Sequence, residues 1–109
     1  IRYDERTKRY WTLANTTEPD KLVIKNDKTR NVLTLCSSED LVSWKQERVV
    51  VSHPDIMYHG MQYVDWQFEG EDIVAVIRTA WDDEEGHAHN QHDSNYIIFR
   101  RVEKYAENR

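Results

Sequence analysis

Histidine and aspartate, side chains that can exchange protons with a bound molecule, gather in two segments of this sequence. All five histidines and four of the aspartates lie between residues 53 and 61 or between 81 and 94: His53, His59, His87, His89 and His92, with Asp55, Asp82, Asp83 and Asp93. Such groups act as acids or bases, or they hydrogen-bond the hydroxyls of a polar ligand. The spacing of His89, His92 and Asp93, with His87 alternating with His89, also resembles a set of metal ligands. A loop with this many acidic and amide groups is more often simply solvated, and we expect neither a metal nor a cofactor.

Two charged residues lie within or beside apolar, strand-like stretches. Asp65 interrupts the stretch 62–68, where a carboxylate must be paired or face water. It is a candidate acid, base or water-orienting group, with a salt bridge to Arg78 as the equally open alternative. Arg78 follows the apolar stretch 73–77, where it can hold an anionic group of a ligand or pair with a nearby aspartate.

The elements that must position these residues are β-strands. Apolar and polar residues alternate with period two along most of the chain, which predicts strands, and no useful length shows helical spacing. Gly70 supplies the turn of a predicted hairpin. We expect the tail from Glu103 to be frayed or to form a short helical turn. The predicted strands are 1–3, 9–14, 31–36, 46–52, 62–68, 73–79 and 95–102.

Short and long connections alternate between these strands, and a weak repeat runs through them. Residues 9–13 match 73–77, and residues 31–35 match 95–99, both at an offset of 64 residues. An antiparallel meander with tight turns at one end and long loops at the other explains both observations. We therefore expect an all-β fold of four-stranded antiparallel units, with a small free-standing β-sandwich as one alternative.

Residues 37–44, Ser-Ser-Glu-Asp-Leu-Val-Ser-Trp, form the most specific short motif. The side chains of Ser37 and Asp40 can bind backbone N–H groups of their own turn, and Trp44 can cover the turn from the strand side. Cys36, the single cysteine, alternates with apolar residues, so we expect a buried, unreactive thiol.

This motif resembles the Asp box of sialidases and related propeller glycosidases, although Leu41 or Val42 stands where glycine is common. The stretches 3–15 and 31–44, and then 59–67, 72–80 and 89–96, resemble the C-terminal part of bacterial sialidase-like proteins. The resemblance implies about one and a half to two blades of a larger, roughly five- or six-bladed β-propeller. Residues 1–52 would form one Asp-box blade, and residues 53–109 the final, incomplete blade.

The resemblance also implies where the loops lie. The connections 15–30, 53–61 and 81–94 would share one face of the propeller, and the turns at 37–44 and Gly70 would share the other. The first face would hold the site, with Asp65, Arg78 and Asp82 as catalytic residues. Substrate would be bound by Tyr58, His59, His89, His92, Asp93 and Asn95, whereas Ser37, Asp40 and Trp44 would be structural.

Composition limits the partners. The net charge of −5 and the absence of a basic run argue against a nucleic-acid binder. No stretch approaches the roughly 18 apolar residues of a membrane span. The resemblance implies a secreted or periplasmic glycoside hydrolase that acts on terminal sugars of glycans, or a non-catalytic carbohydrate-binding or scaffolding propeller. In either case the partners would be a carbohydrate and the remaining blades, and we expect this chain to be inactive alone.

Overall fold

The structure, a computed structural model, describes residues 1–16, 30–55, 57–84, 86, 88 and 94–107. These residues contain strands and turns but no helix, which confirms the prediction of an all-β fold. None of them therefore belongs to a helix that could cross a membrane. The strands are β1 (Arg2–Asp4), β2 (Arg9–Asn15), β3 (Val32–Ser38), β4 (Lys45–Ser52), β5 (Gly60–Glu69), β6 (Asp72–Ala80) and β7 (Tyr96–Val102).

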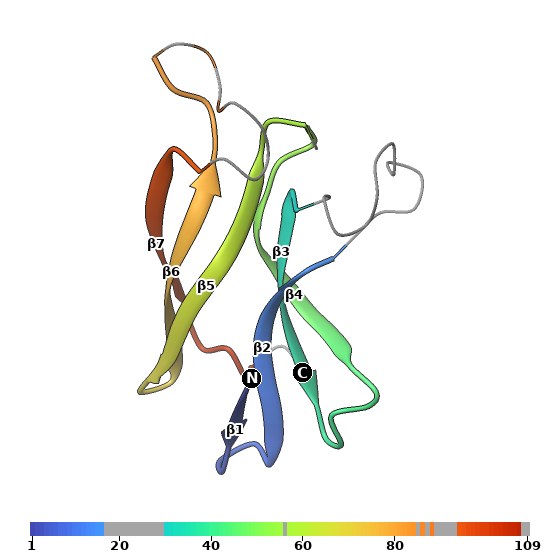
Figure 1. Ribbon diagram of the computed structural model, residues 1–109. Helices are drawn as coiled ribbons and strands as arrows, with labels where there is room; N and C mark the ends of the chain where they lie inside the picture. Colours follow the sequence, from blue (N-terminus) through green and yellow to red (C-terminus); the bar gives the residue numbers. More distant parts are fainter. Residues whose placement is uncertain (17–29, 56, 85, 87, 89–93, 108–109) are drawn as a thin grey trace.

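The strands form two antiparallel sheets, as Figure 1 shows. The first sheet has the order β1-β2-β3-β4 and the second the order β5-β6-β7, so consecutive strands pair within each sheet. The segments that match in the predicted repeat form equivalent strands of the two sheets. β2 and β6 are each the second strand of their sheet, and β3 and β7 are each the third. Residues 70–71 connect β5 to β6 as a tight hairpin in which Gly70 has a φ of 60°, a backbone conformation that glycine adopts without strain.

The strand ends gather at two opposite ends of the molecule (Figure 1). The turns at residues 5–8, 39–44 and 70–71, with the tail 103–107, form what we call the turn end; Arg6 Nη2 donates to the carbonyl of Gly70 there at 3.1 Å. Residues 30–31, 53–59 and 81–82 form the loop end, where Met61 N donates to the carbonyl of Arg30 at 2.8 Å. Residues 17–29, 56, 85, 87 and 89–93 lie outside the described residues.

The core lies between the two sheets. Trp11 and Leu35 of the first sheet and Ile73 and Ile77 of the second are each completely buried. Each such side chain contributes about 1.5–3 kcal/mol by leaving water. Cys36 is also buried, as predicted, and burial together with the charge of Glu47 raises the pKa of its thiol, which keeps the sulfur protonated.

A buried polar network closes the turn end. The hydroxyl of Tyr105 donates to Asp4 Oδ2 at 2.8 Å, and the same oxygen accepts from Thr7 Oγ1 at 2.8 Å. Trp11 Nε1 in turn donates to Thr7 Oγ1 at 2.9 Å. The tail is therefore part of the core rather than frayed, because Tyr105 is 1% exposed and packs edge-on against Trp11.

Candidate functional site

His59 connects the two histidine- and aspartate-bearing segments at the loop end. Its Nδ1 lies 2.7 Å from Asp55 Oδ2, and its Nε2 lies 3.0 Å from Asp82 Oδ1. The side chain of His59 is 6% exposed, whereas that of Asp82 is 58% exposed. The described parts of segments 53–61 and 81–94 thus meet at one end of the strands, as predicted, and a buried imidazole holds a solvent-facing carboxylate.

Asp55 is the inner anchor of this arrangement. Its carboxylate accepts the backbone N–H groups of Tyr58 at 2.8 Å and Met57 at 3.3 Å, in addition to the contact with His59. Burial alone would raise the pKa of Asp55, but these hydrogen bonds and the nearby imidazole lower it overall, so the carboxylate is ionised near neutral pH. Asp55 can therefore fix the orientation of the His59 ring.

His53 and Trp81 enclose His59. The rings of His53 and His59 stack with centroids 3.5 Å apart at an angle of 5°, and Trp81 meets both rings edge-on. The backbone N–H of Asp55 donates to His53 Nδ1 at 3.0 Å, which places the proton of the neutral His53 ring on Nε2.

These residues could also be considered as metal ligands. One ligand atom each from His53, His59 and Asp82 lies within 4.8 Å of the others. However, Nε2 of His53 carries a proton while Nδ1 accepts the Asp55 amide, and lone pairs of two parallel stacked rings do not point to one common atom. The cluster is therefore better described as a hydrogen-bonded network, and we propose no metal here.

Of the other residues predicted to bind substrate, Asn95 and Tyr58 are among the described residues. Asn95 clamps the backbone of Trp81, accepting from its N–H at 3.0 Å and donating to its carbonyl at 2.8 Å, and it also donates to Asp83 at 2.9 Å. Tyr58 is partly exposed beside Asp55. The predicted substrate-binding residues His89, His92 and Asp93 lie outside the described residues.

Asp65 and Arg78 project from the outer face of the second sheet, the face turned away from the core, and both are exposed. No ion pair between them is found among the described residues, because Asp65 is opposite Val76 and Arg78 is opposite Gln62. Arg78 instead lies over the ring of Tyr63, with its guanidinium carbon 5.1 Å from the ring centroid. The histidine network and the Asp65–Arg78 face are therefore two separate clusters.

A β-bulge places Tyr63 on this face. The register of β5 and β6 shifts between Gln62 and Asp65, and Tyr63 has a φ of 50°, the left-handed region that a bulky residue rarely adopts. Bulges of this kind re-aim side chains and are frequent beside active sites. Sequence reasoning did not single out Tyr63, because strict alternation along 62–68 gives no sign of an extra residue.

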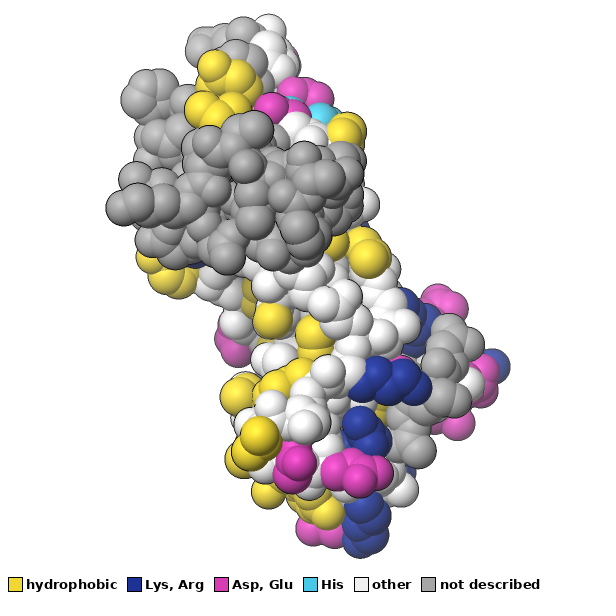
Figure 2. All heavy atoms as spheres, turned by 90° about the vertical axis from the view of Figure 1, so that its right-hand side faces the viewer, with side chains coloured by type: hydrophobic (Ala, Val, Ile, Leu, Met, Phe, Trp, Pro, Cys, Tyr) yellow, Lys and Arg dark blue, Asp and Glu magenta, His cyan; other side chains and the backbone are white. Residues whose placement is uncertain are grey.

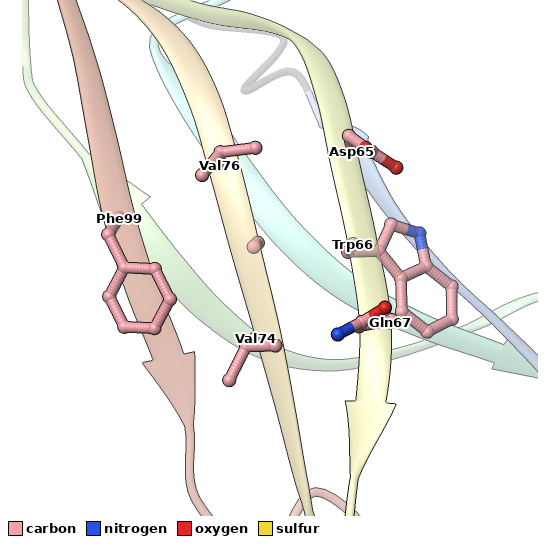
Figure 3. A pocket seen from close by; sticks show the side chains of 7 residues that line it. Asp65, Trp66, Gln67, Val74, Val76 and Phe99 are labelled. Carbon is pink, nitrogen blue, oxygen red and sulfur yellow. The ribbon is translucent and has the colours of Figure 1, made fainter.

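A shallow groove of about 300 Å³ continues along the same face. Figure 3 shows Asp65 and Gln67 on β5, on one side, and Val74, Val76 and Phe99 on β6 and β7, on the other. Phe99 is 56% exposed. The groove therefore has one polar and one apolar side.

The predicted Asp-box turn has its own hydrogen bonds at the turn end. Asp40 Oδ1 accepts the backbone N–H groups of Val42 and Ser43, each at 2.8 Å. Ser38, rather than Ser37, binds the turn, since its Oγ accepts from Leu41 N at 2.8 Å and bonds Asp40. Ser37 Oγ donates to Glu47 instead, and Trp44 is 37% exposed beside the turn.

Charges on the surface are mixed. Figure 2 shows acidic and basic side chains next to one another over the lower part of the visible face, and histidine close to acidic side chains near its upper end. No protein-family model matches the chain, and no curated protein or solved structure is significantly similar to it. These comparisons therefore assign the chain to no family.

Proposed function

We propose that this chain forms the C-terminal blades of a sialidase-like β-propeller glycoside hydrolase, which acts on terminal sugars of glycans. The four-stranded meander β1–β4 would be one blade and β5–β7 most of the next. Two features support this architecture. The Ser38–Asp40 turn joins the third and fourth strands of the meander, as an Asp box does, and the described loop segments lie at the opposite end.

The observation that carries the proposed activity is the group of Tyr63, Asp65 and Arg78 on the outer face of the second sheet, which would border the next blade. The bulge brings a phenol onto the face that carries a carboxylate and a guanidinium, and the ring of Tyr63 rests against Arg78. A backbone conformation that costs on the order of 1–3 kcal/mol persists where the surrounding structure holds it, and such positions cluster at active sites.

Each group has a role in glycoside hydrolysis. Asp65 would protonate the leaving oxygen or activate water, the functions that carboxylates serve in most glycosidases. Arg78 would hold an anionic or hydroxyl group of the sugar. Tyr63 would contact the sugar through its ring or hydroxyl, next to the cation. The remaining blades would complete the site, so the 109-residue chain alone should not turn over a glycoside.

Turnover and binding should be measured separately on the full-length protein. Fluorogenic sialosides, galactosides and glucosaminides would report turnover, and calorimetric titration of the free glycans would report binding. Asp65→Asn should lower kcat by about 10²–10⁴-fold while glycan binding is largely retained. Arg78→Ala should weaken glycan binding as well as turnover, because it removes the group that holds the sugar. Arg101→Ala, on a neighbouring strand of the same sheet, serves as the matched control and should change neither quantity.

A non-catalytic sugar-binding propeller is the second candidate, and the groove beside Asp65 favours it specifically. An exposed aromatic ring opposite polar side chains suits the two unlike faces of a sugar. In that case the wild-type protein would bind glycans without turnover, and Phe99→Ala would weaken binding. If the full-length protein neither bound any glycan nor turned one over, both candidates would be contradicted.

A further inference from the structure

A second cleft lies between the two sheets, on the core-facing side of β7. It has a volume of about 300 Å³, at the lower end of the range for small-molecule sites. Ile98 and Arg100 of β7 are opposite Ile77 and Ala75 of β6, which face the core, so the cleft is on the opposite side of the second sheet from Asp65 and Arg78. It is lined by Val51, Thr79, Trp81, Asp82, Tyr96, Ile98 and Arg100.

Two walls of this cleft are held in place by neighbours that lie outside it. The Asn95 amide binds both backbone polar groups of Trp81, at 3.0 and 2.8 Å. Buried His59 holds Asp82 at 3.0 Å and is itself held by Asp55. A site whose walls are fixed before binding loses less conformational entropy when a ligand enters.

The lining combines two kinds of chemistry. Trp81 and Tyr96 offer aromatic surface, with the aliphatic Val51 and Ile98 beside them. Asp82 offers a hydrogen-bond acceptor, and Arg100, whose Nη1 donates to the carbonyl of Phe99 at 3.0 Å, carries several N–H donors. A pyranose has the matching character, since its C–H face packs on aromatic rings and its hydroxyls both donate and accept.

We propose that this cleft binds one neutral pyranose unit, as a subsite separate from the Tyr63–Asp65–Arg78 face. Asp82 accepts from sugar hydroxyls, Arg100 donates to them, and Trp81 and Tyr96 receive the apolar face of the ring. His59 is a positioning residue, because it contacts Asp82 but does not line the cleft. The choice of a saccharide follows from the proposed function, whereas the location follows from the cavity and its fixed walls.

The test is a titration of the full-length protein with methyl β-D-galactopyranoside, methyl β-D-glucopyranoside and N-acetyl-D-glucosamine. Binding is measured by calorimetry and by the indole N–H signal of Trp81 in NMR spectra. At least one sugar should bind with a Kd in the millimolar range and shift that signal. Tyr96→Ala and Arg100→Ala should each weaken binding by about tenfold. Ile97 lies between Tyr96 and Ile98 on β7, but its side chain is on the outer face of the sheet, away from the cleft, so Ile97→Ala should leave sugar binding unchanged.

His59→Gln provides a second readout, because it keeps a polar side chain but cannot bridge Asp55 and Asp82 in the same way. It should weaken binding by less than Arg100→Ala and leave the overall fold intact by circular dichroism. Absence of binding for all three sugars, or equal loss in Ile97→Ala, would overturn the inference. If Asp65→Asn lost turnover but kept binding in the cleft, the result would support two separate sites. If the wild-type protein bound a sugar in the cleft but turned over no glycoside, the proposed hydrolase function would be contradicted and the cleft inference would stand.

Discussion

The two ends of the strands use similar residue types in opposite ways. At the turn end, Asp4, Thr7 and Tyr105 satisfy one another inside the core, and the aspartate is 6% exposed. At the loop end, the buried His59 joins two carboxylates that both reach solvent, since the side chain of Asp55 is 33% exposed and that of Asp82 is 58% exposed. The exposed Arg6 donates to the Tyr105 hydroxyl at 3.2 Å, so the surface group of the turn-end network is used to stabilise the fold. The loop-end network instead leaves the carboxylate of Asp82 beside a cleft, where it is available to a ligand.

Removal of Tyr105 should have the largest effect on stability. Its ring is buried between Trp11 and Phe68, and its hydroxyl binds Asp4 across 101 residues of sequence. Tyr105→Ala should lower the free energy of unfolding by about 3–5 kcal/mol, as for other buried aromatic residues. Urea unfolding of both proteins at pH 7 measures the difference.

Tyr105→Phe distinguishes the contribution of the hydroxyl to stability from that of the ring in the same experiment. It should cost about 1–3 kcal/mol, because the Asp4 carboxylate loses a donor that water cannot replace there. Ile97→Ala, at an exposed position of β7, is the control and should change stability very little. If Tyr105→Ala were as stable as this control, the tail would not be part of the core.

Acid should weaken the turn end through Asp4. Burial alone would raise the pKa of Asp4, but hydrogen bonds from Tyr105, Thr7 and the Arg6 amide, with the charge of Arg6, lower it overall. The carboxylate therefore contributes stability that is fully present above its unfolded pKa of about 3.9 and is lost as the pH falls through the lower folded value.

Asp4→Asn should make this acid dependence less steep. The variant should be less stable than the wild type at pH 7, and the difference should narrow as the pH falls from 5 toward 3. Some dependence should persist, since the pKa values of Asp40, Asp55 and Asp72 are also lowered by their hydrogen bonds. Urea unfolding at a series of pH values measures it, and parallel curves for the two proteins would exclude this role for Asp4.

The sequence predicts the strands well, because period-two alternation is a local signal. The predicted stretches 9–14, 73–79 and 95–102 agree with β2, β6 and β7 to within about a residue at each end. Gly70 also marks its turn locally. The convergence of the loops could be predicted from strand order alone, since alternate connections of a meander lie at the same end.

The sequence does not predict features that depend on distant contacts or on local irregularity. Nothing near Tyr105 indicates that it binds Asp4, and the tail 103–107 has the composition of a frayed end. The bulge that turns Tyr63 outward leaves no mark in the alternation. His59 could be singled out as a polar loop residue, but its two carboxylate partners follow only from the folded loop end.

Asp40→Ala tests a smaller contribution to the turn end. Its carboxylate accepts two backbone N–H groups, as a helix-capping side chain does, so the substitution should lower the midpoint of thermal unfolding. Glu39→Ala, next to it but exposed and paired with Arg9 at the surface, should cost less than about 0.5 kcal/mol. Equal losses measured by thermal unfolding would show that the Asp40 hydrogen bonds do not stabilise the turn.

Tyr63→Gly should have the smallest effect on stability and a large effect on function. Glycine adopts a positive φ without the penalty that tyrosine incurs, which is about 1–2 kcal/mol for an L-residue in this region. This gain offsets the lost contact with Arg78, which contributes about 0.5–1 kcal/mol at an exposed site. The net change by urea unfolding should therefore lie within about 0.5 kcal/mol, the range of ordinary surface substitutions.

The same variant should lose most glycoside turnover if the bulge serves to present Tyr63 beside Arg78. Tyr63→Val is the informative partner, because a β-branched residue tolerates this conformation poorly and should be less stable than both other proteins. If Tyr63→Gly were strongly destabilised, the bulge would be a structural requirement of β5, like Tyr105 at the turn end. A stable Tyr63→Gly without turnover would instead mark the outer face as a place where the chain accepts strain in order to position a side chain.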